Sequence, residues 1–182
     1  MQWTIPGTAL SGLREEADEL EKQFHTFFTL GGLTLSQVCT ITGLEPYTVQ
    51  NWVKRGFLPS PVGKKYDMEQ LCRLINMNIL RGTMPLEQII KLMSYLNGTL
   101  SDESDDLVDD TMLFFLFVKL AARARYIGGS ETWDDALVHA TDDYREPVPG
   151  AREKLVKVLK VMLTIWVANQ LKAQAEEMIA HL

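Results

Sequence analysis

Between residues 46 and 66 the sequence groups side chains that can hydrogen bond to DNA bases with side chains that can bind phosphate. Amide side chains match the paired donor and acceptor edge of adenine in the major groove, whereas lysine and tyrosine suit the phosphate backbone. The candidate DNA-contacting residues are Tyr47, Thr48, Gln50, Asn51, Lys54, Arg55, Lys64, Lys65 and Tyr66. The spacing therefore predicts a surface that binds double-stranded DNA.

Two short helices separated by a tight turn are predicted to position these residues. Thr34 suits the N-cap of the first helix, and Gln37 three residues later completes a capping box. Gly43 should end that helix because glycine enters the left-handed conformation without a steric penalty, and Pro46 suits the first turn of the next helix. The buried side of the first helix should consist of Leu35, Val38, Cys39 and Thr42.

The second helix, which Gly56 should close, is predicted to turn one face inward and the other toward solvent. Its apolar residues Val49, Trp52 and Val53 recur at helical spacing and should be buried. The residues that this pattern leaves facing outward are Tyr47, Thr48, Gln50, Asn51 and Lys54. This helix is therefore the predicted major-groove element.

Residues 57–66 favour a short exposed hairpin, because their two prolines remove the backbone donors that a central strand needs. Lys64 and Lys65 lie at the predicted tip. The expected roles are base reading by Thr48, Gln50 and Asn51, backbone contact by Tyr47 and Lys54, and phosphate binding by Lys64 and Lys65.

These residues resemble the DNA-binding domain of the MerR family. The family pattern is a Thr-Ile-Arg-Tyr-Tyr recognition helix, then Gly-Leu-Leu-x-Pro and a wing ending in Arg-x-Tyr. Residues 48–52, 56–58 with Pro61, and 64–66 match it, with Gln50 and Asn51 in place of the arginine and the first tyrosine. The resemblance implies a winged helix-turn-helix that regulates transcription, with Tyr66 ending the wing.

A second resemblance is closer. The run NWVKRGFLPSPVGKKY, followed by YLNG and SDESDDLVDD, is similar to an uncharacterised bacterial family, domain of unknown function 1836, which carries a MerR-like winged helix. The similarity extends over roughly residues 13–120. It implies a fold and a regulatory role, and it supplies no known ligand.

Charge is distributed unevenly along the chain. The whole sequence has 18 Lys and Arg against 24 Asp and Glu, a net charge of −6, so its surface as a whole is not a nucleic-acid footprint. Residues 33–100 contain seven basic and four acidic residues, a local charge of +3, whereas residues 101–146 contain four basic and twelve acidic residues, a local charge of −8. A basic module next to an acidic one can approach DNA with the first alone.

We predict an all-α fold with a small β wing, in which a winged helix-turn-helix is followed by a helical bundle. Three divisions are expected: an N-terminal segment of residues 1–32, the winged helix over residues 33–98, and a helical C-terminal half over residues 99–182. The N-terminal segment should form one helix over about residues 12–29. Within the winged helix, Asp67 should cap a helix that runs to about Arg81, with Gln70 at the third position completing a capping box. Pro85 should open another helix that ends near residue 97.

Three helices are expected in the C-terminal half. The first, residues 105–127, is apolar on every side and should be buried, either at the centre of this half or across a dimer interface. Ser130 should cap a second helix over residues 131–144, and a third should span residues 151–179. Its apolar stripe suits either dimerisation or an intramolecular bundle.

Metal and thiol chemistry are not expected. Asp105 and Asp109, like Asp106 and Asp110, could place paired carboxylates on one helical face, but acidic residues also stabilise a helix N-terminus without metal, which we favour. The two cysteines belong to no Cys-x-x-Cys pair and should be reduced and buried. The three histidines are isolated from one another, so no zinc site is predicted.

No phosphate-loop, dinucleotide-binding or hydrolase motif occurs, so we expect neither an enzyme nor a cofactor. The amino terminus has no basic region ahead of an apolar run, and no apolar segment approaches about 20 residues, so a cytoplasmic protein without membrane spans is expected.

The predicted function is transcriptional regulation by a DNA-binding protein that acts as a homodimer. The alternative is a protein-interaction adaptor that uses the acidic C-terminal half. A third possibility is a small effector bound among aromatic residues of that half, although a plain core is favoured. Those aromatic residues are Phe114, Phe115, Phe117, Trp133 and Trp166.

Overall fold

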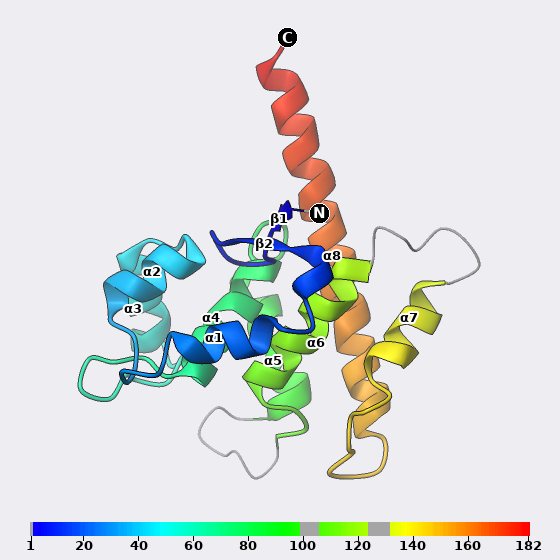
Figure 1. The fold of residues 1–182 in the computed structure, drawn as a ribbon, viewed down its shortest axis with the longest axis horizontal. Coiled ribbons are helices and arrows are strands. Elements are labelled where there is room, and N and C mark those ends of the chain that lie inside the picture. Colours follow the sequence, from blue (N-terminus) through cyan, green and yellow to red (C-terminus); the bar gives the residue numbers. More distant parts are fainter. Residues whose placement is uncertain (1, 99–105, 124–131) are drawn as a thin grey trace.

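The computed structural model describes residues 2–98, 106–123 and 132–182. Its elements are β1 (Gln2–Thr4), β2 (Ser11–Leu13), a short 3₁₀ helix η1 (Arg14–Glu16), α1 (Leu20–Thr26), α2 (Leu35–Thr42), α3 (Pro46–Lys54), α4 (Met68–Leu80), α5 (Leu86–Asn97), α6 (Asp110–Arg123), α7 (Trp133–Ala140) and α8 (Ala151–Ala180). Figure 1 shows α2 and α3 at one end of the molecule and α7 at the other, with the C-terminal part of α8 projecting from the body.

The N-terminal segment differs from the prediction of one helix over residues 12–29. Strands β1 and β2 pair antiparallel, with Trp3 opposite Gly12, and only the short helix α1 follows. The reversal between the strands includes Gly7, which has a φ of +71°. A Cβ there would lie 2.7 Å from the Ile75 carbonyl oxygen, so glycine lets the hairpin approach α4. The apolar spacing after residue 12 predicted a longer helix. The contact with α4 that accompanies the hairpin involves residues far apart in the sequence, so the local pattern could not show it.

The predicted β wing is formed by turns and isolated bridges. Residues 57–66, hereafter the wing, contain one bridge between Val62 and Lys65, and a second bridge joins Tyr66 to Leu33 ahead of α2. Neither extends into a strand. At the first bridge, Pro61 lies next to Val62 and cannot donate a ladder hydrogen bond. The only paired strands among the described residues are those of the N-terminal hairpin.

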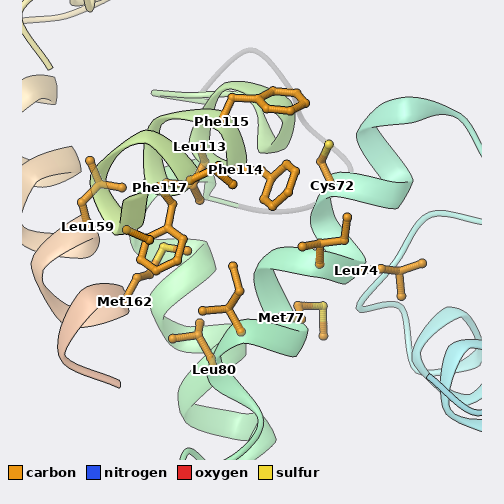
Figure 2. Packing of buried hydrophobic residues seen from close by; sticks show 14 of the residues in the cluster. Cys72, Leu74, Met77, Leu80, Leu113, Phe114, Phe115, Phe117, Leu159 and Met162 are labelled. Carbon is orange, nitrogen blue, oxygen red and sulfur yellow. The ribbon is translucent and has the colours of Figure 1, made fainter. Parts of the chain in front are cut away.

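The hydrophobic core is continuous from the N-terminal hairpin to α8. Helix α4 is buried along almost its whole length and packs against α6 and α8. Figure 2 shows Cys72 and Leu80 of α4 on the side of that helix that faces the labelled side chains of α6 and α8. The residues predicted to form a winged-helix unit therefore share one core with the C-terminal half.

Helix α6 is buried on most sides, as its sequence predicted, and its neighbours belong to the same chain. Phe114 and Phe115 lie against Phe24 of α1, with both ring centroids 5.5 Å from that of Phe24. The structure begins this helix at Asp110 rather than 105, and residues 124–127 lie outside the described ones. The alternative of a dimer interface is not needed to explain its apolar sequence.

The last two helices agree with the prediction in type and differ in detail. Helix α7 is shorter than residues 131–144, and its N-cap is Thr132, whose capping box with Asp135 replaces the predicted cap. The predicted cap Ser130 lies outside the described residues. Helix α8 spans 30 residues and matches the expected bounds closely. In the described part of the chain no helix has both the length and the apolar content needed to cross a membrane.

Candidate nucleic-acid interface

Helices α2 and α3 are joined by a tight turn that local sequence signals explain. The predicted capping box is present: the Gln37 amide donates to the Thr34 hydroxyl at 3.4 Å, and the Thr34 amide donates to Gln37 Oε1 at 2.9 Å. Gly43 has a φ of +69° and ends α2, and Pro46 opens α3. Asn78 of α4 donates to the Thr42 carbonyl at 2.9 Å, which fastens the turn to the core.

Helix α3 is anchored by its buried face. Val49 and Trp52 are almost fully buried, as predicted. Thr48, which was predicted to face solvent and read bases, is only 9% exposed. The prediction was wrong because Thr48 is one helical turn before Trp52, so its side chain lies over the same buried edge. In this conformation Thr48 supports the helix and offers no surface to DNA.

The outward face of α3 is open. Tyr47 is 72% exposed, and Gln50, Asn51 and Lys54 are exposed as well. Within the described residues the side chains of Gln50 and Asn51 make no hydrogen bonds, so their amide groups are available to a ligand. Arg55, just after the helix, places its guanidinium carbon 4.6 Å from the centre of the Phe57 ring.

The wing presents its two lysines at a sharp reversal. Gly63 and Lys64 both have positive φ, 56° and 62°, and the Lys65 amide donates to the Val62 carbonyl at 2.9 Å. Two successive positive φ values are typical of a two-residue type I′ turn, although lysine is rarely found in this conformation. Lys64 and Lys65 are exposed. The turn therefore holds two ammonium groups at the surface.

Tyr66 is a structural residue of the wing rather than part of its surface. It is 4% exposed, and its backbone exchanges two 2.8 Å hydrogen bonds with Leu33. Burial raises the pKa of its phenol. In this conformation the Tyr66 ring points into the protein, so it does not make the DNA contact that the MerR resemblance implies.

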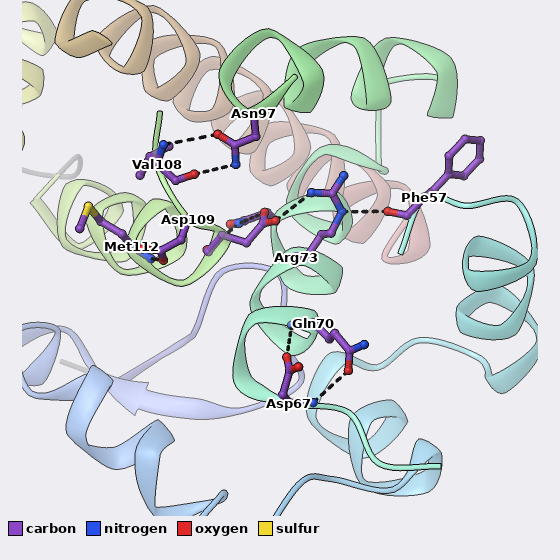
Figure 3. A network of polar contacts seen from close by, with 10 residues as sticks. Phe57, Asp67, Gln70, Arg73, Asn97, Val108, Asp109 and Met112 are labelled. Carbon is purple, nitrogen blue, oxygen red and sulfur yellow. Dashed lines mark hydrogen bonds and ion pairs between the residues drawn. The ribbon is translucent and has the colours of Figure 1, made fainter. Parts of the chain in front are cut away.

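Two side chains of α4 hold the first residues of the wing, residues 57–60, hereafter the wing base. Arg73 Nε donates to the Phe57 carbonyl at 2.8 Å. Gln70 Nε2 donates to the carbonyls of Pro59 and Ser60, each at 3.2 Å, while Gln70 also completes the predicted capping box of α4. Figure 3 shows Arg73 and Gln70 reaching from α4, with the Phe57 carbonyl bonded to Arg73.

The other end of Arg73 forms a buried ion pair. Its Nη1 lies 2.8 Å from Asp110 Oδ2, and the two side chains are 10% and 5% exposed. Asn76 adds a hydrogen bond of 3.1 Å to Asp110 Oδ1. Burial raises the pKa of Asp110, and the Arg73 guanidinium opposes that rise. Arg73 is one of the seven basic residues that give residues 33–100 their local charge of +3, and its position between apolar residues of α4 was the signal in the sequence that it is buried.

A cavity of about 140 Å³ adjoins this ion pair. It is lined by Pro59 of the wing base, Gln70 and Arg73 of α4, Asn97 of α5 and Asp110 of α6, among others. The cavity lies where the wing base and the helical body meet.

In the described part of the acidic segment before α6, Asp109 and Asp110 make contacts that stabilise the fold. Asp109 accepts a 2.7 Å hydrogen bond from the Met112 amide at the start of α6, and Asp110 pairs with Arg73. Asp105 lies outside the described residues. Among the residues that are described, no group of three or more side chains is arranged to hold a metal ion.

The aromatic residues considered for an effector site are largely core residues. Phe114, Phe115 and Phe117 are buried, and the Phe114 and Phe115 ring centroids are 5.0 Å apart. Trp133 and Trp166 are partly buried and pack against the hydrophobic core. Both cysteines are free thiols: Cys72 is buried as predicted, whereas Cys39 is only partly buried, and burial raises the pKa of each.

The central part of the chain is similar to known sequences. Residues 32–113 match the family described as Domain of unknown function (DUF1836). This confirms the similarity to that family over a shorter range than residues 13–120, and the MerR-like winged helix stays a prediction. A similar curated protein, Uncharacterized protein YkrK of Bacillus subtilis (strain 168), is 35% identical over 78 residues, which cover 41% of this chain and 34% of that protein. The chain thus spans about a third of that relative's length. No solved structure matches the chain.

Proposed function

We propose that this chain binds double-stranded DNA through α3 and the wing and regulates transcription. The observation that carries the proposal is the outward face of α3, where two amide side chains are exposed with no internal partner. Such amides can form paired hydrogen bonds with adenine in the major groove. The arrangement of α2, α3 and the wing supports a MerR-like winged helix-turn-helix as the structural basis of this activity.

The charge around α3 favours a polyanionic partner. Residues 33–66 contain four basic residues, Lys54, Arg55, Lys64 and Lys65, and one acidic residue, Glu45. All four basic side chains are exposed. The predicted roles of the lysines as phosphate ligands and of Gln50 and Asn51 as base-reading residues remain part of the proposal, and Thr48 and Tyr66 are assigned to the scaffold instead.

We further propose that the protein acts as a homodimer. A single small DNA-binding module buries only about 600–1,000 Å² on DNA, which is low for a regulator, and two copies would read two half-sites. Helix α8 provides a candidate contact, because Leu171, Met178 and Ile179 are exposed on the part that projects from the body. A partner that covers these side chains would stabilise this part of α8, because most helical stability in proteins comes from the packing of an apolar face.

A fluorescence anisotropy titration with random duplex DNA over a salt series tests the proposal. Asn51→Ala should reduce preference among sequences, and Lys64→Ala should weaken all duplexes alike. Lys157→Ala is a matched control, since Lys157 is a surface lysine of α8 paired with Glu153. Absence of binding at low salt would reject the DNA proposal and favour the adaptor function of the acidic C-terminal half.

A further inference from the structure

The position of the wing base depends on α4 more than on the wing itself. The carbonyl oxygens of Phe57, Pro59 and Ser60 all accept hydrogen bonds from side chains of α4. Within the wing, in contrast, one bridge at the tip supplies the only strand-like pairing. Removing the α4 donors would therefore leave the wing base attached through the buried Leu58 side chain and through the Phe57 amide, which donates to the Trp52 carbonyl at 2.9 Å.

Arg73 links this attachment to a second part of the fold. One edge of its guanidinium bonds to Phe57 and the other to Asp110, the first residue of α6. Asn76 bonds both to the Asp110 carboxylate and to its carbonyl, at 3.1 and 2.9 Å, which fixes the start of α6 on α4. The wing base and α6 thus share one side chain although they are far apart in sequence.

An arginine is well suited to this arrangement. Its planar guanidinium presents several donors in fixed directions, so it can bind a carbonyl and a carboxylate at once, whereas a lysine ammonium lacks that planar fork. The Arg73 side chain is only 10% exposed, so it is not placed to bind a phosphate itself. Its effect on DNA must therefore act through the wing.

We infer that Arg73 is a positioning residue for the DNA-reading surface: it couples the wing base to the start of α6, so that movement of α6 alters the wing. The DNA part of this inference rests on the proposed function. The coupling itself is a property of the free protein and can be measured without DNA.

Amide hydrogen exchange of the free protein tests the coupling directly. In Arg73→Lys, the backbone amide of Phe57, which donates to the Trp52 carbonyl next to the altered contact, should exchange about tenfold faster, as expected when one charge-assisted hydrogen bond is weakened. Core amides of α8 should change little. Arg81→Met is the control, because Arg81 is an exposed residue at the end of α4. Equal acceleration throughout the core, or an unchanged wing in folded Arg73→Lys, would overturn the inference.

DNA binding provides the second readout. Arg73→Lys should lower affinity about tenfold without changing the salt dependence, because no phosphate contact is removed. Asp110→Asn should lower it similarly, and the double variant should lose less than the product of the two, as expected for residues that act through one contact. Independent, multiplicative losses would contradict the coupling. If the wild-type protein binds no duplex, the proposed function fails, while the exchange experiment still decides the role of Arg73.

Discussion

Replacing both wing lysines by alanine should change how strongly salt weakens DNA binding. Each phosphate contact by a lysine or arginine releases condensed counterions, so the logarithm of the affinity falls with the logarithm of salt with a slope of about −0.9 per contact. Lys54, Arg55, Lys64 and Lys65 are the exposed basic residues of α3 and the wing. One copy that uses all four should show a slope of about −3.6.

These slopes predict a large difference between variants. From about 50 to about 200 mM salt, a slope of about −3.6 corresponds to a loss of about 150-fold per copy. Lys64→Ala together with Lys65→Ala should reduce the slope to about −1.8 and the loss to about 12-fold. Two copies bound to two half-sites would double each slope.

The assay is anisotropy of a labelled duplex at four or more salt concentrations, with circular dichroism to confirm that each variant is folded. Lys157→Ala, in α8, should keep the wild-type slope. The reasoning would be refuted if the wing variant and wild type had equal slopes, because the ammonium groups at the turn would then not contact phosphate.

Four further predictions concern the scaffold. Trp52→Ala should lower the free energy of unfolding by about 3–5 kcal/mol in denaturant titrations, because the side chain is buried; a loss below about 1 kcal/mol would contradict its anchoring role. Gly7→Ala should lose more stability than Gly56→Ala, since both have φ near +70° but only Gly7 has atoms within 4 Å of an added Cβ, and equal melting temperatures would argue against the close approach to α4. Leu171→Glu should shift the proposed dimer to monomer in sedimentation velocity, with no shift if α8 does not form the contact. Burial raises the pKa of Tyr66 in the folded protein, so the stability that its neutral phenol contributes is complete below the unfolded-state pKa of about 10 and is lost as pH rises through the higher folded-state pKa. Between neutral and alkaline pH, Tyr66→Phe should therefore lose less stability than the wild-type protein in denaturation experiments, and equal losses would contradict this reasoning.

Local signals in the sequence predicted the local structure well. The capping boxes at Thr34 and Asp67 and the end of α2 at Gly43 depend on residues within a few positions of one another, and the structure confirms them. The exposed face of α3 followed from the burial of Val49 and Trp52. These features need no knowledge of the rest of the fold.

Features that depend on distant residues were not predictable in the same way. Arg73 and Asp110 are 37 positions apart, and each has an ordinary local explanation as surface charge or as a helix-start acid. The N-terminal hairpin depends on its approach to α4. Long-range packing decided both cases. The burial of Thr48, in contrast, follows from its position one helical turn before Trp52, a local signal that was present in the sequence.

The continuous core has a practical consequence for dissecting the protein. A fragment that ends at residue 98 would keep α3 and the wing but lose α6 and α8, which cover α4. The apolar side chains that become exposed would include Cys72 and Leu80, and Arg73 would lose its ion pair with the Asp110 carboxylate. The segment that meets the ligand is therefore not autonomous, and point substitutions in the intact chain will report on it more faithfully than truncation.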